Sequence, residues 1–178
     1  QMGNQGHSGN GVRDICEWIW AGVIGDVTEV HAWTNRPVWN TQGISQRPPS
    51  ESVPEGLDWD CWIGGAPYRE RRKNMHSFAW RGWLDYGTGT IGDMGCHMID
   101  LPFTALDLGA PVTVEAESAK PAHPESAPIW LIARWTFPAR GELPPVYLTW
   151  YDGNKRPSLQ REYNMPDWPE ATLFVGSK

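Results

Sequence analysis

Two residues four positions apart, Asp93 and His97, offer the clearest chemistry in the chain. Apolar residues around them recur at helical spacing, so the carboxylate and the imidazole should share one face of a helix. Four glycines between positions 87 and 95 let the backbone turn sharply there and leave room for a ligand. Near a helix N-terminus an imidazolium is disfavoured, so a neutral His97 could act as a general base. Asp93 would then orient either His97 or the substrate.

The same spacing is compatible with two further roles. Asp93 could cap the helix while His97 packs in a core, and the spacing alone supports this structural role equally well. Asp93, His97 and Asp100 could also offer ligands to a metal ion, but a single imidazole makes this the weakest of the three hypotheses. We therefore predict no metal site.

The composition limits the classes of function. The 178 residues suit one domain or two, and a net charge of −6 argues against a nucleic-acid partner, which requires a basic face. No run of about 18 apolar residues is present, which excludes a membrane-spanning helix. The three cysteines are far apart and lack a metal-ligand pattern, which argues against a disulfide framework. Free thiols favour a reducing compartment, but an odd count also occurs in exported proteins, so a cytoplasmic and an exported location both stay open. Twelve tryptophans are the outlier, and they indicate an unusual core or a carbohydrate-binding platform.

Apolar periodicity and turn residues predict an α+β (α/β) fold, with an open, mostly antiparallel sheet and helices packed on one face. The expected helices cover Val12–Ile24 and Asp93–Leu108, the second kinked at Pro102 and ended by Gly109, with a short helical turn at Asp58–Ile63 capped by Asp58. The expected strands are Val27–Trp33, Val112–Ala119, Ile129–Phe137, Val146–Tyr151 and Leu173–Val175.

The stretch from residue 36 to residue 83 has little periodicity and many turn residues, yet it is rich in tryptophan. A linker would not carry so many tryptophans, so we predict that this stretch lines a functional site. Arg81 lies close to two indoles, where a guanidinium can stack or bond to hydroxyls, although a structural cation–π pair is an equal alternative. The predicted substrate-binding residues are Asn35, Arg36, Trp80, Arg81 and Trp83.

The segment Gly89–His97 resembles the G-x-x-x-D-x-G-x-H signature in the C-terminal domain of the Gfo/Idh/MocA family of NAD(P)-dependent oxidoreductases. Three further segments, Gly22–Trp33, Leu57–Pro67 and Trp80–Trp83, resemble one branch of that family, in the same order. The resemblance implies a two-part enzyme, in which an N-terminal Rossmann domain binds the dinucleotide and a C-terminal domain builds the substrate site. It also implies a homo-oligomer that associates through the sheet.

The chain opens on Gln1 without a signal peptide and closes on a strand-like segment, which indicates a fragment cut at both ends. The resemblance implies that residues 1–10 end the Rossmann domain and that residues 11–178 are the substrate domain, truncated at its C-terminus. No G-x-G-x-x-G pattern follows a strand and no Glu-Lys-Pro motif is present, so a missing domain would bind most of the NAD or NADP. We therefore expect the fragment alone to be inactive. Gln5 and His7 would reach the nicotinamide side of the site.

The reaction that the resemblance implies is hydride transfer between a sugar or sugar-derivative hydroxyl and NAD(P). His97 would take the hydroxyl proton, Asp93 would hydrogen-bond the same hydroxyl or tune His97, and a lysine of the missing half would complete the site. The protein would supply geometry and proton transfer while the cofactor accepts the hydride. Two alternatives stay open, an NAD-dependent glycoside hydrolase of the same superfamily and a non-catalytic carbohydrate-binding module. We expect a sugar-like small molecule as partner, and neither nucleic acid nor a membrane.

Overall fold

The computed structural model describes residues 3–178, and the sheet at its centre has five strands. In spatial order these are β2 (Thr113–Ser118), β3 (Leu131–Phe137), β4 (Val146–Tyr151), β1 (Val27–Thr34) and β5 (Glu170–Gly176). Neighbouring strands are antiparallel except β1 and β4, which run parallel. The predicted α+β class with an open, mostly antiparallel sheet is confirmed, and each predicted strand is present with ends shifted by no more than three residues.

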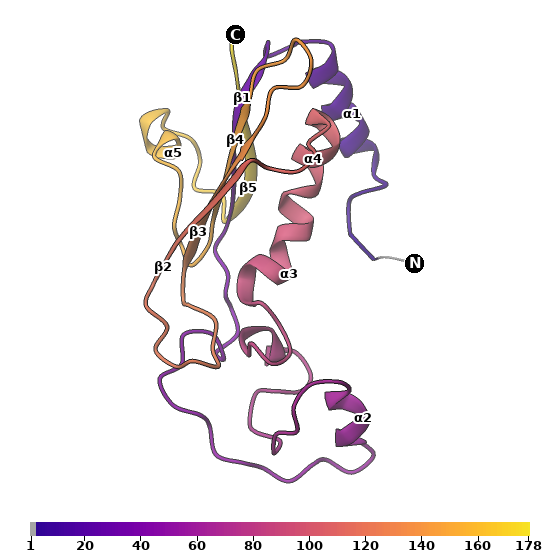
Figure 1. Cartoon of the computed structure of the whole chain (residues 1–178), viewed down its shortest axis with the longest axis vertical. Coiled ribbons are helices and arrows are strands. Elements are labelled where there is room, and N and C mark those ends of the chain that lie inside the picture. Colours follow the sequence, from indigo (N-terminus) through magenta and orange to yellow (C-terminus); the bar gives the residue numbers. More distant parts are fainter. Residues whose placement is uncertain (1–2) are drawn as a thin grey trace.

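Three helices cover one face of the sheet, and α5 (Leu159–Glu162) lies on the other side (Figure 1). The three are α1 (Asn10–Trp20), α3 (Gly89–Met98) and α4 (Asp100–Leu106). The core between helices and sheet consists of Val27, Val30, Ala32, Met94, Leu106, Leu108, Ala133, Phe137, Val146, Leu148 and Trp150. Each large apolar side chain of this kind, when fully buried, stabilises the fold by about 1.5–3 kcal/mol. The core therefore fixes α3 firmly against the sheet.

Helix α3 begins four residues earlier than the predicted start at Asp93. Gly89 has a φ of 67°, a conformation that glycine adopts without strain, and this lets the chain turn directly into the helix. The N-cap position is Thr88 rather than Asp93. His97 consequently lies in the last turn of α3, so the argument from a helix N-terminus does not apply to it.

The break in the predicted long helix also lies elsewhere. The chain leaves helix α3 at Ile99 and starts α4 at Asp100, whereas the prediction placed a kink at Pro102. Pro102 instead occupies the first turn of α4, where a missing N–H breaks no helical hydrogen bond. The helix then ends at Asp107, whose φ of 49° is left-handed, before Gly109 is reached.

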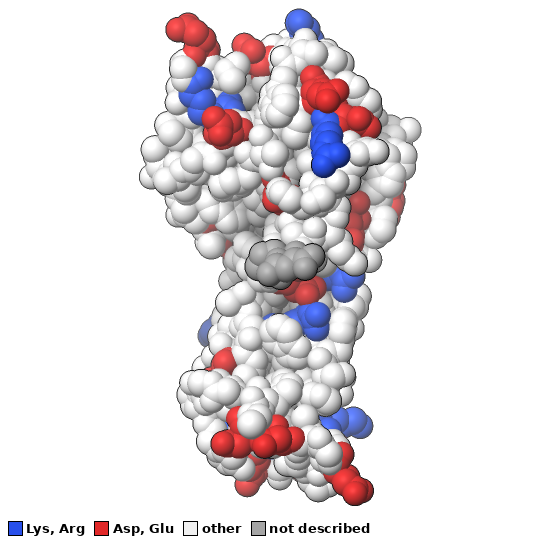
Figure 2. All heavy atoms as spheres, turned by 90° about the vertical axis from the view of Figure 1, so that its right-hand side faces the viewer, with Lys and Arg blue, Asp and Glu red and all other residues white. Residues whose placement is uncertain are grey.

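Most of the irregular stretch forms the lower part of the molecule, joined to the upper part through a narrower waist (Figures 1 and 2). It has a core of its own, built from Trp59, Ile63, Met75 and Trp83. Within it, the helix α2 (Trp59–Ile63) is capped by Asp58, whose side chain accepts a hydrogen bond from the Cys61 backbone N–H, as predicted. The short 3₁₀ helix η1 (Ala79–Gly82) leads from this core toward α3.

Charged side chains are scattered over the face shown in Figure 2, with both signs interspersed. Within residues 3–178, no helix has the length and apolar character needed to cross a bilayer.

Candidate functional site

A cavity of about 380 Å³ lies beside helix α3. It is lined by Gln5, Arg36, Phe78, Arg81, Asp93, Met94, His97, Met98 and Glu170. Five of the predicted site residues are in this set, and they come from four separate segments of the chain: Gln5, Arg36, Arg81, Asp93 and His97. Its volume is at the lower end of the range of about 300–1,000 Å³ that small-molecule sites occupy.

The two predicted catalytic residues share one face of α3, as their spacing requires. The burial of Met94 against the sheet fixes the rotation of this helix, and the next turn presents His97 to the cavity. The His97 ring is half-buried, and among the described residues no side chain hydrogen-bonds to it. An imidazole placed in this way can exchange a proton with a ligand in the cavity.

Asp93 is paired with Arg81, and not with His97. The Arg81 Nε donates to Asp93 Oδ1 over 2.5 Å, and its Nη1 donates to the Phe78 carbonyl over 2.6 Å. The guanidinium also stacks over the rings of Phe78 and Trp80, at 4.4 and 5.0 Å from their centroids. The prediction that Asp93 orients His97 directly therefore has no hydrogen bond to support it, whereas orientation of a substrate by Asp93 stays a prediction.

A second ion pair, between Arg36 and Glu170, also lines the cavity. The Arg36 Nε lies 3.3 Å from Glu170 Oε1, and the buried Thr34 hydroxyl donates to the same oxygen over 2.9 Å. Strand pairing brings these residues together, because Thr34 and Glu170 are directly opposite each other in the β1–β5 ladder. Each of the two arginines is paired with a carboxylate. The net charge of the side chains that line the cavity is therefore zero when His97 is neutral.

The other predicted residues lie elsewhere. Trp83 is 3% exposed in the core of the irregular stretch, so it cannot contact a substrate in the cavity, and this prediction is corrected. Asn35 is exposed beside Arg36 without lining the cavity. His7 does not line it either, since its Nδ1 lies 2.7 Å from Asp100 Oδ2. Trp80 lines a neighbouring cavity.

The pairing of Asp100 with His7 also separates Asp100 from Asp93 and His97, the residues whose spacing could have offered metal ligands. Across residues 3–178, no three histidine, cysteine or acidic side chains gather closely enough to hold a metal ion.

Sequence reasoning missed Glu170, Phe78 and the two methionines of the lining. Met94 and Met98 are four positions apart on the same helix, so their spacing could have shown that they share a face with each other. Glu170 carries no such signal, because only the register of β5 against β1 brings it to Arg36.

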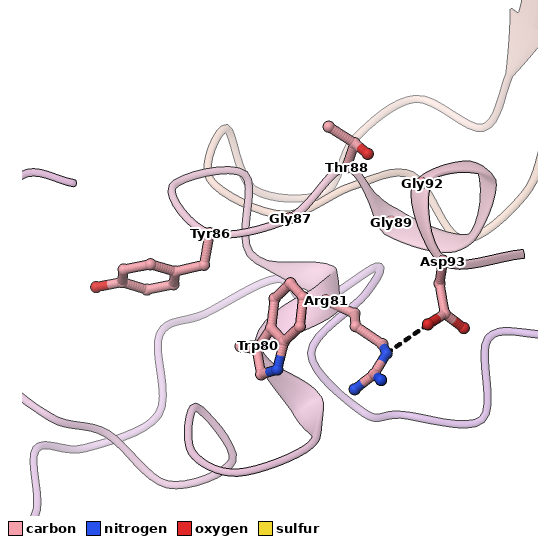
Figure 3. A pocket seen from close by; sticks show the side chains of 8 residues that line it. All are labelled: Trp80, Arg81, Tyr86, Gly87, Thr88, Gly89, Gly92 and Asp93. Carbon is pink, nitrogen blue, oxygen red and sulfur yellow. Dashed lines mark hydrogen bonds and ion pairs between the residues drawn. The ribbon is translucent and has the colours of Figure 1, made fainter. Parts of the chain in front are cut away.

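The neighbouring cavity has a volume of about 350 Å³ and shares Arg81 and Asp93 with the first. Figure 3 shows the Arg81–Asp93 ion pair on one side of this cavity, with Trp80 next to Arg81. The Tyr86 ring is directed away from the ion pair. The glycine turn that opens α3 forms the remaining wall.

That turn contains the spacing G-x-G-x-x-G at positions 87–92, the pattern of dinucleotide-binding loops. It does not have their context, because it follows the 3₁₀ helix η1 and not a strand. Its glycines also serve internal packing, since a Cβ at Gly87 would lie 2.7 Å from the Arg81 carbonyl oxygen and one at Gly89 would lie 2.7 Å from the Ala127 Cβ. This turn therefore lacks the strand–turn–helix context of a Rossmann dinucleotide-binding loop.

The model of the oxidoreductase family C-terminal alpha/beta domain (GFO_IDH_MocA_C2) matches residues 12–141. In structure, the chain is similar to the super-repressor mutant of Gal80p from Saccharomyces cerevisiae, with a TM-score of 0.56 and 14% identity over 98% of this chain and 38% of that one. An oxidoreductase from Thermotoga maritima is similar with a TM-score of 0.47 and 14% identity, over 94% of this chain and 37% of that one. No curated protein matches the chain.

The chain thus spans about two fifths of the length of both solved structures. Gln1 and Met2 lie outside the described residues, and the boundary between residues 1–10 and 11–178 stays a prediction. Because the family model covers well over half of the sequence, the chain belongs to the Gfo/Idh/MocA oxidoreductase family, as its C-terminal alpha/beta domain.

Proposed function

We propose that this domain forms the substrate-binding side of an NAD(P)-linked oxidoreductase that acts on a hydroxyl group of a sugar-like compound. The observation that carries the proposal is the cavity that gathers His97, Asp93, Arg81 and Arg36. A concave site with a few convergent polar groups is the usual form of a small-molecule site. Its balanced charges favour an uncharged, hydroxyl-rich ligand over a strongly anionic one.

In the proposed mechanism His97 accepts the proton of the substrate hydroxyl that is oxidised. Its ring faces the cavity without a hydrogen bond from another described side chain, so a nitrogen is free for that proton. Asp93 accepts a hydrogen bond from a substrate hydroxyl through the oxygen that Arg81 leaves free, and Arg36 donates to another. These contacts fix the hydroxyl against His97, which lowers the barrier by orientation.

The dinucleotide would be held mainly by a separate Rossmann domain, since the glycine turn before α3 does not follow a strand as a dinucleotide-binding loop does. When bound, NAD(P) supplies the acceptor for the hydride. Gln5 lines the cavity and is the residue of this chain that we assign to the nicotinamide side. His7 is not assigned that role, because it faces Asp100.

The proposal is tested on the protein that carries this domain together with a dinucleotide-binding domain. Monosaccharides, disaccharides and sugar acids are incubated with NAD or NADP while NAD(P)H absorbance is followed. We expect a sugar-dependent increase in absorbance. If a glycoside is cleaved with no net change in absorbance, the hydrolase alternative is correct; if sugars bind but no product forms, the carbohydrate-binding module is correct.

Replacing Arg81 with methionine is expected to raise KM at least about 10-fold and to lower kcat much less. The substitution removes the cation that holds Asp93 in place, and hydrogen bonds to charged groups contribute about 1.5–3 kcal/mol each. Steady-state kinetics with the best sugar measures the effect. The matched control is Arg71→Met, which removes an ion pair with Glu51 in the same irregular stretch but outside the cavity. Equal KM values in the two variants would contradict the assigned role.

We also propose that the chain forms a homo-oligomer through the sheet face opposite α1, α3 and α4. Tyr147 of β4 is 55% exposed, and its neighbour Leu148 points into the core, so Tyr147 lies on that opposite face. Light scattering is expected to give a multiple of the protomer mass, and Tyr147→Glu is expected to reduce it. A monomeric wild type would contradict the proposal.

A further inference from the structure

The second cavity, beside the Arg81–Asp93 pair, has no role in the proton transfer proposed above. It is lined by Trp80, Arg81, Tyr86, Gly87, Thr88, Gly89, Gly92 and Asp93 (Figure 3). Because Arg81 and Asp93 line both cavities, a ligand in one lies next to a ligand in the other. The two volumes, about 350 and 380 Å³, are similar. Two neighbouring cavities of similar volume suit a ligand that consists of two units of similar size.

The lining of the second cavity combines one aromatic surface with hydrogen-bonding groups. Trp80 is half-buried and offers ring surface, which suits the apolar C–H face of a sugar ring. The Tyr86 ring packs edge-on against Trp62 at 5.1 Å, which holds the wall of the cavity rigid. Helix α3 begins at this wall, and the Thr88 side chain makes no capping hydrogen bond to it.

The charge of this lining argues for a neutral ligand. Arg81 is the one cation among the lining residues and Asp93 the one anion, and they are bonded to each other. A phosphate would gain from Arg81 and from the helix N-terminus, but it would meet the Asp93 carboxylate at the same place. Hydroxyl groups suffer no such conflict, because they can donate to Asp93 and accept from Arg81.

We propose that the second cavity binds a second sugar unit, so that the substrate class is a disaccharide. This inference rests on the proposed function, in which the first unit presents its hydroxyl to His97. The linkage between the two units passes over the Arg81–Asp93 pair, which contacts both. Trp80 then acts as a specificity residue for the second unit, and not as a catalytic residue.

The test compares disaccharides with their own constituent monosaccharides. Isothermal titration of the full chain is carried out with cellobiose, maltose and lactose, and with glucose and galactose. At least one disaccharide is expected to bind about 10-fold more tightly than its units do. Trp80→Ala is expected to abolish this difference and Trp80→Phe to preserve part of it, since phenylalanine keeps a ring. Trp18→Ala, which removes a 60% exposed indole on α1, is the matched control and is expected to change nothing.

The inference is overturned if no disaccharide of the set binds more tightly than its units, or if Trp80→Ala keeps the full difference. The affinities of the wild-type chain for disaccharides and for their units can be compared even if a variant fails to fold. Failure of the proposed function has a different signature: sugars would bind, but the protein with its dinucleotide-binding domain would form no NAD(P)H with any of them.

Discussion

Replacing His97 with asparagine is expected to lower kcat for sugar oxidation by about 10²–10⁴-fold, the usual contribution of a general base. Asparagine is similar in size and polar, so the cavity and the last turn of α3 should stay intact. It cannot accept a proton at neutral pH. KM should change little, because Asp93, Arg81 and Arg36 still hold the substrate hydroxyls.

The measurement is steady-state kinetics on the protein with its dinucleotide-binding domain, together with the affinity for NAD(P). The cofactor affinity is expected to be unchanged, since His97 belongs to the substrate side of the site. His76→Asn is the matched control, because this exposed histidine does not line the cavity. A wild-type kcat in the His97 variant would show that another group takes the proton.

Replacing Asp152 with alanine is expected to lower the free energy of unfolding by about 2–5 kcal/mol, because two buried donors lose their acceptor. The side chain is 1% exposed and lies just after β4. It accepts hydrogen bonds from the Leu131 backbone N–H over 2.6 Å and from Trp150 Nε1 over 3.1 Å. It therefore ties the end of β4 to the start of β3. Urea unfolding measures the loss, and a change below about 0.5 kcal/mol, the size typical of surface sites, would contradict it.

The same carboxyl makes stability depend on pH. Burial raises the pKa of Asp152 to about 6 from a usual value of 3.8, although the hydrogen bonds from Trp150 and Leu131 oppose the rise. The folded state thus keeps its proton to higher pH than the unfolded state does. The contribution to stability is complete below the unfolded pKa and is lost as the pH rises through the folded value. Between pH 3.8 and about pH 6, the free energy of unfolding of the wild type should therefore fall relative to that of Asp152→Asn. Parallel pH profiles of the two proteins would refute the assignment.

The sequence was sufficient for the strands of the sheet and for five of the nine residues that line the cavity. An alternating β-branched run predicts β1, turn segments delimit β3 and β4, and the i, i+4 spacing of Asp93 and His97 places both on one wall. The start of α3 was missed because the glycine turn before Asp93 suggested a loop, whereas Gly89 in a left-handed conformation begins the helix there. The break at Ile99 was missed because Pro102 is the stronger local signal for a helix break. Pro102 lies in the first turn of α4, where a proline does not interrupt the helix.

Composition could not separate the tryptophans that build a core from those that line a cavity. Trp33 and Trp150 are fully buried in the sheet, and Trp59 and Trp83 form the second core of the irregular stretch. Trp80, a member of the predicted aromatic wall, lines the cavity that shares Arg81 and Asp93 with the cavity of His97. Which indoles face a ligand depends on how the irregular stretch folds on itself, and no periodic pattern encodes that packing.

The most direct test of the central claim, that the cavity beside α3 receives the substrate hydroxyl, is to follow the histidine ring signals by NMR during titration with the best-bound sugar. We expect the His97 signals to shift in step with saturation, while those of His76 and His123, which do not line the cavity, stay in place. Saturation with no change at His97 would contradict the claim.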